Sequence, residues 1–395
     1  MSTAKKGFFG LCVLFLVFVL LATVPVTKAA TLDQSSSGTS EYLEVRMGSS
    51  LSERERIKNV VETYFELRYK GQQLLKTQDF SFLVSNTSVA KQWAHKESDK
   101  REIEIYLATL YHLNYVRYKY TLDYDKIYID EESARAVVEL RESHEVVFES
   151  IAPEVSKLAN LKHVIILSKT DAGWKIVRDE YEDELTQLMA GESKAQILAR
   201  IKKNYEDEIQ ERQRNVEIVP SNEVEGIRGV HIYNGWAAAN YADTYWHYYN
   251  PAYTAYSSDC TNFVSQAIYE GTSHTMSPVD PNHYRDYWYY SAGNGSYPWI
   301  NVTGIYNFLT TNTGRGPYGE YSYVCYMAKG DVIELYASGQ GWFHAVIVAK
   351  VIDSGYCWDK RNILIDSHTT DRYHYPLNYY SAYGKRYIHI TGWNN

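Results

Sequence analysis

Residues 258–266 constrain this chain most, because they place one cysteine at the expected start of a helix. Apolar residues recur through and beyond this segment at helical spacing: Phe263, Val264, Ala267 and Ile268. Ser258 or Asp259 can cap that helix, which leaves Cys260 in its first turn. Free backbone N–H groups and the positive end of the helix dipole stabilise a thiolate there. The pattern therefore favours a catalytic nucleophile over a buried structural cysteine.

A histidine later in the chain is the best candidate for the base that this cysteine needs. His344 stands at the head of an otherwise apolar predicted strand, and general-base chemistry requires an imidazole within reach of the thiol. A third group should hold the other nitrogen of that ring. On the next predicted strand, alternation puts Asp366 and His368 on the same face, so both residues compete for this role.

The first 29 residues have the features of a secretory signal peptide. Lys5 and Lys6 form a basic start, residues 7–26 are almost uninterruptedly apolar, and small residues offer cleavage after Ala29. A retained membrane anchor is the alternative, because twenty apolar residues can span a bilayer. Cleavage would remove three lysines and no acidic residue, and the formal net charge would change from −8 to −11. We therefore predict a secreted or cell-wall protein without a later membrane segment.

Charge and cysteine usage exclude several classes of partner and site. An acidic mature chain argues against nucleic acid, and it gives no general attraction to an anionic wall. The mature chain keeps Cys260, Cys325 and Cys357, which are too few for a disulfide framework. Cys325 and Cys357 can form a bridge or remain core thiols. No cofactor is expected, and a zinc site built from Cys260 or Cys325 with His344 and His368 lacks every usual ligand spacing.

The chain divides by composition into a lead-in, two folded regions and a connection. Residues 30–50 are rich in serine and glycine and predict a flexible lead-in. Residues 51–185 predict a small α+β domain, of a cystatin-like or NTF2-like type by pattern alone. Residues 186–229 are heavily charged and predict a solvated helical linker. Residues 230–395 form the second domain, in which many of the 38 tyrosines are concentrated.

Periodicity predicts the elements of both domains. In the first, helical patterns occupy 51–69, 79–93 and 99–113, and β-like runs occupy 118–129, 134–148 and 162–177. A hairpin signal interrupts the last run at 171–173. In the second domain, helices are predicted at 234–248, after Cys260 and at 305–311, and strands at 328–335, 342–349 and 362–369. Helices followed by antiparallel strands predict an α+β fold.

The second domain resembles the putative amidase domain of Gram-positive exported proteins. The shared motifs are Tyr233-Asn234, Ala238, Asn240-Tyr241-Ala242, Asn250-Pro251, the block Asp259–Gln266, Gly330-Asp331-Val332-Ile333, His344-Ala345-Val346-Ile347-Val348 and Ser367-His368-Thr369. The resemblance covers about residues 230–395, and that family is related to the NlpC/P60 and CHAP cysteine peptidases of the papain-like superfamily. It implies a papain-like domain in which a helix-borne cysteine packs on an antiparallel sheet.

The resemblance also implies site residues. Carried over by motif, Cys260 is the nucleophile, His344 the base and His368 the third member, with Asp366 as the alternative. Two departures bear on substrate contacts more than on the catalytic pair. The family's Gly-Gly after the cysteine helix is Gly271-Thr272 here, and an arginine usual in the first helix is missing near residues 235–236.

These observations predict a secreted cysteine amidohydrolase that cuts an amide bond in peptidoglycan or a related wall peptide. Backbone N–H groups at the start of the Cys260 helix would stabilise the oxyanion. Asp259 would contact a substrate amine, or would cap the helix. The alternative is a non-catalytic wall-binding or carbohydrate-binding module on the same scaffold, and the intact set of Cys260, His344 and His368 argues against it.

Overall fold

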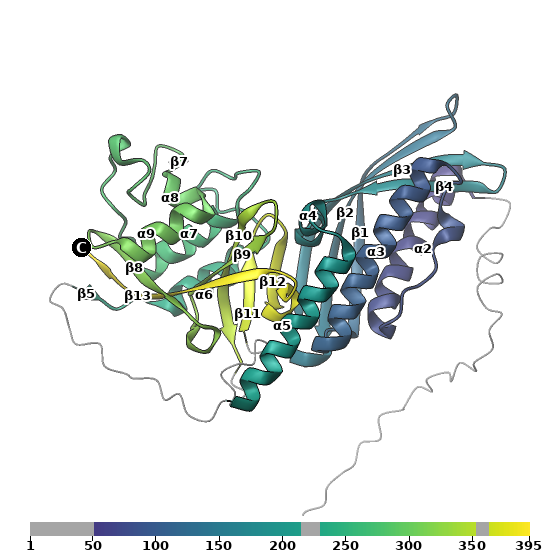
Figure 1. Cartoon of the computed structure of the whole chain (residues 1–395). Coiled ribbons are helices and arrows are strands. Elements are labelled where there is room, and N and C mark those ends of the chain that lie inside the picture. Colours follow the sequence, from purple (N-terminus) through teal and green to yellow (C-terminus); the bar gives the residue numbers. More distant parts are fainter. Residues whose placement is uncertain (1–50, 215–229, 353–362) are drawn as a thin grey trace, which may run out of the picture. The chain divides into compact units, whose positions relative to one another are not determined.

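The computed structural model describes residues 51–214, 230–352 and 363–395 (Figure 1). The predicted signal peptide, the lead-in at 30–50 and Cys357 lie outside these residues. Contacts group Ser52–Asn395 into one compact unit. Within the described ranges, no helix is both long enough and apolar enough to span a bilayer.

Two long helices open the described chain, α2 (Glu53–Leu74) and α3 (Ser88–Tyr111). Ser52 and Glu55 form a capping box at the start of α2. The Thr87 side chain accepts a hydrogen bond from the Ala90 N–H, so α3 begins at Ser88. The two helices predicted at 79–93 and 99–113 are therefore one helix, preceded by a 3-10 turn at Ser81–Leu83.

Four antiparallel strands follow as a meander: β1 (Tyr115–Asp130), β2 (Arg135–Phe148), β3 (Ser156–Thr170) and β4 (Gly173–Glu180). The predicted hairpin lies between β3 and β4, where Gly173 adopts a φ of 92° that favours glycine. Helix α2 packs on this meander through fully buried residues: Ile57, Val61, Phe65, Val138, Leu140 and Ile165. The predicted α+β layout of helices first and strands second is therefore present.

The second region alternates helices with antiparallel strands. Its helices are α6 (Gly235–Tyr245), α7 (Cys260–Gly271), α8 (Tyr297–Ile300) and α9 (Val302–Thr311). Its strands are β5 (Val230–His231), β6 (Tyr290–Ser291), β7 (Asn294–Gly295), β8 (Gly316–Ser322), β9 (Val332–Ala337), β10 (Gly341–Val351), β11 (Ile363–Ser367), β12 (Asp371–Pro376) and β13 (Gly384–Asn394). A mixed α+β fold with an antiparallel sheet is thus confirmed.

One 11-stranded sheet joins both regions in the described part of the chain. Its order is β1-β2-β3-β12-β11-β10-β9-β13-β5, with β4 on β3 and β8 on β13. Strand β12 pairs with β3 at Arg372 and Leu158, so the N-terminal meander continues into the second region. Helix α7 packs on one face of the second region through an apolar cluster that includes Phe263, Ala345 and Ile347.

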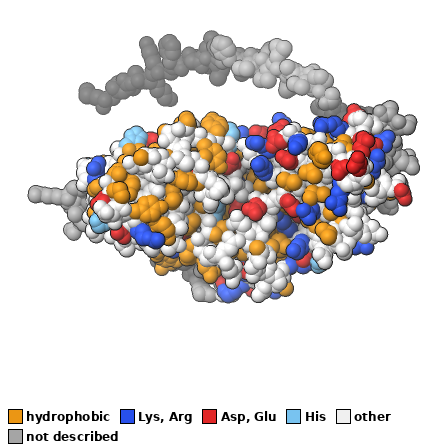
Figure 2. Space-filling model, turned by 90° about the horizontal axis from the view of Figure 1, so that it is seen from above, with side chains coloured by type: hydrophobic (Ala, Val, Ile, Leu, Met, Phe, Trp, Pro, Cys, Tyr) orange, Lys and Arg blue, Asp and Glu red, His pale blue; other side chains and the backbone are white. Residues whose placement is uncertain are grey.

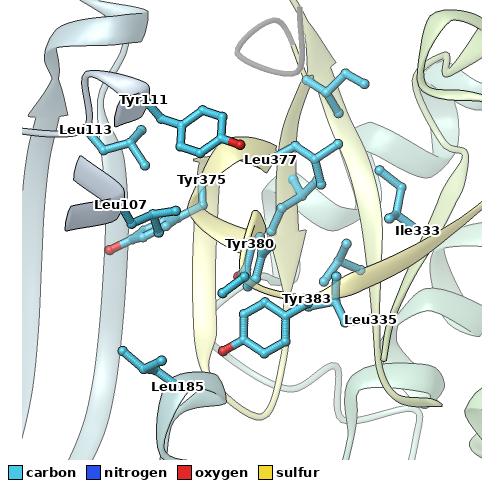
Figure 3. Packing of buried hydrophobic residues seen from close by; sticks show 14 of the residues in the cluster. Leu107, Tyr111, Leu113, Leu185, Ile333, Leu335, Tyr375, Leu377, Tyr380 and Tyr383 are labelled. Carbon is cyan, nitrogen blue, oxygen red and sulfur yellow. The ribbon is translucent and has the colours of Figure 1, made fainter. Parts of the chain in front are cut away.

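The segment predicted as a solvated linker is folded into the core where the structure describes it. It contains most of α4 (Glu184–Gly191) and all of α5 (Lys194–Arg214). Ile197 and Ile201 of α5 are fully buried in a cluster that also contains β9 and β10 residues. Figure 3 shows other members of this cluster: Leu107, Tyr111, Leu185, Ile333, Leu335, Tyr375 and Tyr380. The prediction of a solvated linker was wrong because apolar residues at helical spacing lie between the charged residues and form a buried face.

Charge is unevenly distributed on the molecular surface. On the face in Figure 2, acidic and basic side chains gather at the right, where Figure 1 places α2, α3 and the meander. The left part, which carries α7 to α9 in Figure 1, is mostly apolar or uncharged. This matches the change of composition that the sequence shows near residue 230.

Candidate active site

Cys260 is the first residue of α7 and is only 2% exposed. The neighbouring Asp259 does not cap the helix with its side chain. Instead, its Oδ1 accepts hydrogen bonds from the Tyr256 backbone N–H and the Asn262 Nδ2, both at 2.9 Å. The helix start predicted from the sequence is therefore present, but the carboxylate of Asp259 stabilises the preceding turn rather than the helix backbone.

His344 lies near the start of β10 and is 4% exposed. An irregularity in the pairing of β10 with β9 falls between Trp342 and His344, and His344 then stands opposite Leu335. The structure brings the His344 imidazole to the Cys260 thiol, so the predicted nucleophile and base lie together.

The two groups shift each other's ionisation in opposite directions. Burial alone would raise the pKa of Cys260, but hydrogen bonding to His344 and the charge of that ring outweigh burial and lower it. The backbone N–H of Ala345 and the Thr261 hydroxyl lower the pKa of Cys260 further. Burial alone would lower the pKa of His344, and the interaction with Cys260 raises it instead. Both shifts favour a thiolate–imidazolium pair.

The group that faces the second side of the His344 ring is Glu184, the first residue of α4. Its Oε1 lies 3.9 Å from Nε2 of His344, and that nitrogen makes no hydrogen bond within the described residues. Glu184 is 3% exposed, and its charge contributes to the raised pKa of His344. In catalytic triads a buried carboxylate orients the imidazole through a hydrogen bond, and Glu184 lies on the side of His344 where such a group would stand.

Arg372 of β12 fixes the Glu184 carboxylate in place. Its Nε donates to Oε1 at 3.1 Å and its Nη2 donates to Oε2 at 2.8 Å. Burial alone would raise the pKa of Glu184, but Arg372 outweighs burial and lowers it. The Tyr380 hydroxyl adds a longer contact to Oε1 at 3.4 Å. Glu184 therefore remains an anion in a fixed orientation.

The start of α4 is itself anchored to α3. The Asp183 side chain caps α4 by accepting from the Thr186 N–H at 2.8 Å. Its Oδ1 also accepts from Nζ of the buried Lys100 at 2.8 Å. Because Glu184 follows Asp183 directly, the N-terminal region holds the carboxylate that faces His344.

His368, predicted as the third member, does not contact His344 in the structure. Its Nδ1 lies 2.8 Å from Oδ2 of Asp259, and its Nε2 lies 2.6 Å from the Tyr245 carbonyl oxygen. Both ring nitrogens therefore face an oxygen atom that can accept a hydrogen bond. The ring also stacks on Phe263 of α7, with centroids 4.0 Å apart. His368 thus holds the residue before the nucleophile, and the geometry gives it no contact for orienting the base.

Asp366, the alternative third member, lies in a different cluster. Its Oδ1 accepts from the His374 backbone N–H at 2.7 Å, and its other oxygen has no hydrogen-bond partner in the described part of the chain. Burial and the neighbouring Asp243 carboxylate raise the pKa of Asp366 well above its usual range. The prediction placed Asp366 and His368 on one face of a continuous strand. Because β11 ends at Ser367 and the chain turns there, the two side chains lie in different surroundings, and neither contacts His344.

Asp259, predicted to contact a substrate amine, is fully buried. Its carboxylate already interacts with the Tyr256 backbone, Asn262 and His368, and its own N–H donates to the Thr369 hydroxyl at 3.0 Å. The geometry therefore gives Asp259 a structural role, as a link between the α7 start and the turn after β11.

Sequence reasoning missed Glu184. It lies in a charged run at the end of the predicted first domain, just before the predicted linker at 186–229, and no motif separates it from its neighbours. The available signal was indirect: an apolar pattern at Leu185 and Leu188, both buried, predicts a helix that packs rather than one that is solvated.

Replacing His368 with alanine should destabilise the protein. The change removes the buried hydrogen bond between His368 and Asp259 and leaves that carboxylate partly unpaired, which costs about 1–3 kcal/mol. We expect a lower urea midpoint, measured by circular dichroism, together with any loss of activity. An unchanged unfolding curve with full loss of activity would instead support the catalytic role predicted from the sequence.

Known proteins are similar to the second region of the chain. The chain is similar to the uncharacterized protein YhbB of Bacillus subtilis (strain 168), with 28% identity over 142 residues, which covers 35% of this chain and 42% of that protein. The chain thus matches less than half of that relative's length. A solved structure, the intermembrane space region of the chloroplast protein ARC6, aligns with 33% of this chain and 96% of its own at 16% identity and a TM-score of 0.19, which is too low to support an argument. Residues 232–391 match the family model described as "Putative amidase domain", so this part of the chain is similar to that family.

Proposed function

We propose that this protein hydrolyses an amide bond through a thioester on Cys260. The family of residues 232–391 points to hydrolysis of a C–N bond. The observation that carries the cysteine mechanism is the buried pair of Cys260 and His344, in which the pKa of the thiol is lowered and the pKa of the imidazole is raised. A stabilised thiolate next to an imidazolium is the activated form of a cysteine nucleophile.

The chemistry follows from this pair. The Cys260 thiolate attacks the carbonyl carbon and forms a C–S bond and a tetrahedral oxyanion. The His344 imidazolium gives its proton to the leaving nitrogen as the C–N bond breaks, which releases the amine and leaves a thioester. Neutral His344 then takes a proton from water while the water oxygen attacks the thioester. The C–S bond breaks, the carboxylic acid leaves, and the thiolate–imidazolium pair is restored.

Glu184 has the orienting role in this mechanism. It faces Nε2 of His344 and, through Arg372, is held in one orientation. The negative charge of Glu184 stabilises the imidazolium that accompanies the thiolate. Its Oε1 lies 3.9 Å from Nε2 of His344, and hydrogen bonds between catalytic groups often become shorter when substrate binds.

Backbone N–H groups at the start of α7 are the proposed oxyanion donors. They point from the helix N-terminus toward the space beside Cys260 and need no side chain. Since Cys260 is 2% exposed and His344 is 4% exposed, a substrate carbonyl reaches the thiolate only when side chains that cover it move. Substrate binding is therefore expected to open this site.

The proposed substrate is a peptide amide of the bacterial cell wall, and the proposed fold of residues 230–395 is papain-like. Support comes from the sequence: the cysteine motif resembles the amidase domains of exported proteins, and residues 1–29 have the features of a signal peptide.

Secreted protein should begin near Ala30. The small residues before that position fit signal peptidase, whereas a retained apolar segment would keep the protein on the membrane. Edman sequencing of protein from the culture medium checks this expectation. A chain that starts at Met1 and sediments with membranes would mean that the enzyme is anchored.

The reactivity of Cys260 tests the proposed mechanism. In reduced native protein at mildly acidic pH, iodoacetamide should modify Cys260 before Cys325, although Cys260 is the more buried of the two. The reason is that the imidazolium of His344 keeps Cys260 as a thiolate. Peptide mapping by mass spectrometry gives the order, with urea-denatured protein as the control that removes the difference. Faster labelling of native Cys325 would argue against an activated Cys260.

A further inference from the structure

Two carboxylates and an imidazole converge at a place away from Cys260. Asp243 of α6, Asp366 of β11 and His374 of β12 each bring one candidate ligand atom within 4.8 Å of the others. Nε2 of His374 lies 2.9 Å from Oδ1 of Asp243. When an ion is bound at metal–ligand distances of about 2.0–2.2 Å, neighbouring ligand atoms lie about 3 Å apart, and the distance between Nε2 and Oδ1 is close to this.

The deepest member of this cluster has an unpartnered atom. Asp366 is fully buried, and within the described residues no protein N–H group donates to its Oδ2, while the Asp243 carboxylate lies beside the Asp366 carboxylate. Its Oδ1 is fixed by the His374 backbone N–H at 2.7 Å, so the orientation of the carboxylate is set by β12. A buried carboxylate oxygen without a donor is costly unless a proton or a cation satisfies it.

The cluster lacks protein cations that would neutralise it. In the described ranges, Asp243 forms an ion pair with His374, and neither Asp243 nor Asp366 forms one with a lysine or an arginine. The His374 ring is held in place by stacking on Tyr373, with centroids 3.8 Å apart and planes at 10°. Two neighbouring carboxylates and a fixed imidazole together form a preorganised donor set.

We propose that Asp243, Asp366 and His374 bind one divalent cation of the zinc class. One nitrogen and two carboxylate oxygens suit Zn²⁺, which takes three protein ligands and a fourth from solvent. Calcium and magnesium are hard cations that prefer oxygen ligands, so the imidazole of His374 favours the zinc class over both. The side chain of Asp243 is 35% exposed, so the ion enters and exchanges from the α6 side.

The bound ion would tie α6 to two strands of the sheet. Strand β11 leads directly into His368, whose ring contacts both the Tyr245 carbonyl of α6 and Asp259. A cation at Asp366 therefore stabilises the same α6–β11 junction that supports the start of α7. The proposal is independent of the amidase mechanism, because the three ligands do not contact Cys260 or His344.

Isothermal titration with ZnCl₂ tests the site. The protein is the untagged mature chain, treated with a chelator and carrying Cys260→Ala, so that the Cys260–His344 pair cannot bind the ion. We expect one Zn²⁺ per chain and a melting temperature that rises with added Zn²⁺. Asp366→Asn should weaken binding at least tenfold. Asp286→Asn is the matched control, because Asp286 lies 3.6 Å from His283 in an exposed Asp–His pair.

A second variant keeps the test decisive if Asp366→Asn does not fold. His374→Gln retains the backbone donor to Asp366 but removes the nitrogen ligand, and it should also lose Zn²⁺ binding. Co²⁺ added in place of Zn²⁺ should give visible d–d absorption that His374→Gln abolishes. Absence of Zn²⁺ binding in the Cys260→Ala protein, or binding that survives both variants, would overturn the proposal and leave the two carboxylates as a pair that shares a proton.

Discussion

Replacing Cys260 with alanine should lower kcat/KM for amide hydrolysis by about four orders of magnitude or more, because no other group in the site can form the thioester. The fold should persist, since alanine removes one buried sulfur atom at the start of α7 and changes the free energy of unfolding by about 1 kcal/mol. Steady-state rates and a urea unfolding curve separate loss of chemistry from loss of structure.

Cys325→Ala is the matched control for this experiment. Cys325 is a partly buried cysteine that packs against the core cluster and lies outside the proposed site. It should retain activity within a few-fold of the unmodified protein. If Cys260→Ala keeps activity within tenfold, Cys260 is not the nucleophile and the mechanism fails.

Replacing Glu184 with glutamine should lower kcat by about two to four orders of magnitude, because the neutral amide no longer stabilises the His344 imidazolium. The negative charge of Glu184 helps to raise the pKa of His344, so its loss should lower that pKa. The pH range in which the thiolate–imidazolium pair exists should then contract at its alkaline end. The rate of Cys260 alkylation, measured across pH, reports this shift independently of turnover.

Glu184→Gln removes both the ion-pair partner of Arg372 and the negative charge that faces His344, so the two effects must be separated. Removing one member of a buried ion pair costs about 3–5 kcal/mol, so Glu184→Gln should also unfold more easily. Glu97→Gln is the matched control, since Glu97 is a buried glutamate that pairs with Arg101 at 2.8 Å in α3. It should lose stability but keep the alkylation profile. An unchanged profile in Glu184→Gln would mean that Glu184 supports only the fold.

The sequence predicted best those features that depend on local patterns. The helix start at Cys260, the hairpin before Gly173 and the alternation of strands were all visible as spacing of apolar, turn and capping residues. The sequence did not predict that one sheet runs through both regions, because the pairing of β12 with β3 joins residues more than two hundred positions apart. Nothing in the composition of either strand identifies its neighbour.

The site was only partly predictable for the same reason. Cys260 and His344 could be recognised because each sits at the end of a regular element with a strong pattern. The contact of Glu184 with His344 depends on where the whole of α4 docks, which Lys100, Asp183 and the shared core determine. His368 was assigned by resemblance alone, and its true neighbours, Asp259 and Tyr245, follow from the turn after β11.

The proposed cation site shows most clearly which kind of site cannot be predicted from the sequence. Its ligands come from α6, β11 and β12, and the first lies more than one hundred residues before the others. Short ligand motifs were the basis for expecting no metal, and such motifs detect only sites whose ligands lie close together in sequence.

Digestion of purified muropeptides by the mature protein tests the central claim most directly. The reaction is run in ¹⁸O-labelled water, and the products are identified by mass spectrometry. We predict two fragments for each cleaved peptide, a new amine and a new carboxylic acid that carries one ¹⁸O atom, and no fragments with Cys260→Ala. Intact muropeptides after incubation with the unmodified protein, or equal cleavage by Cys260→Ala, would contradict a cell-wall amidase that acts through Cys260.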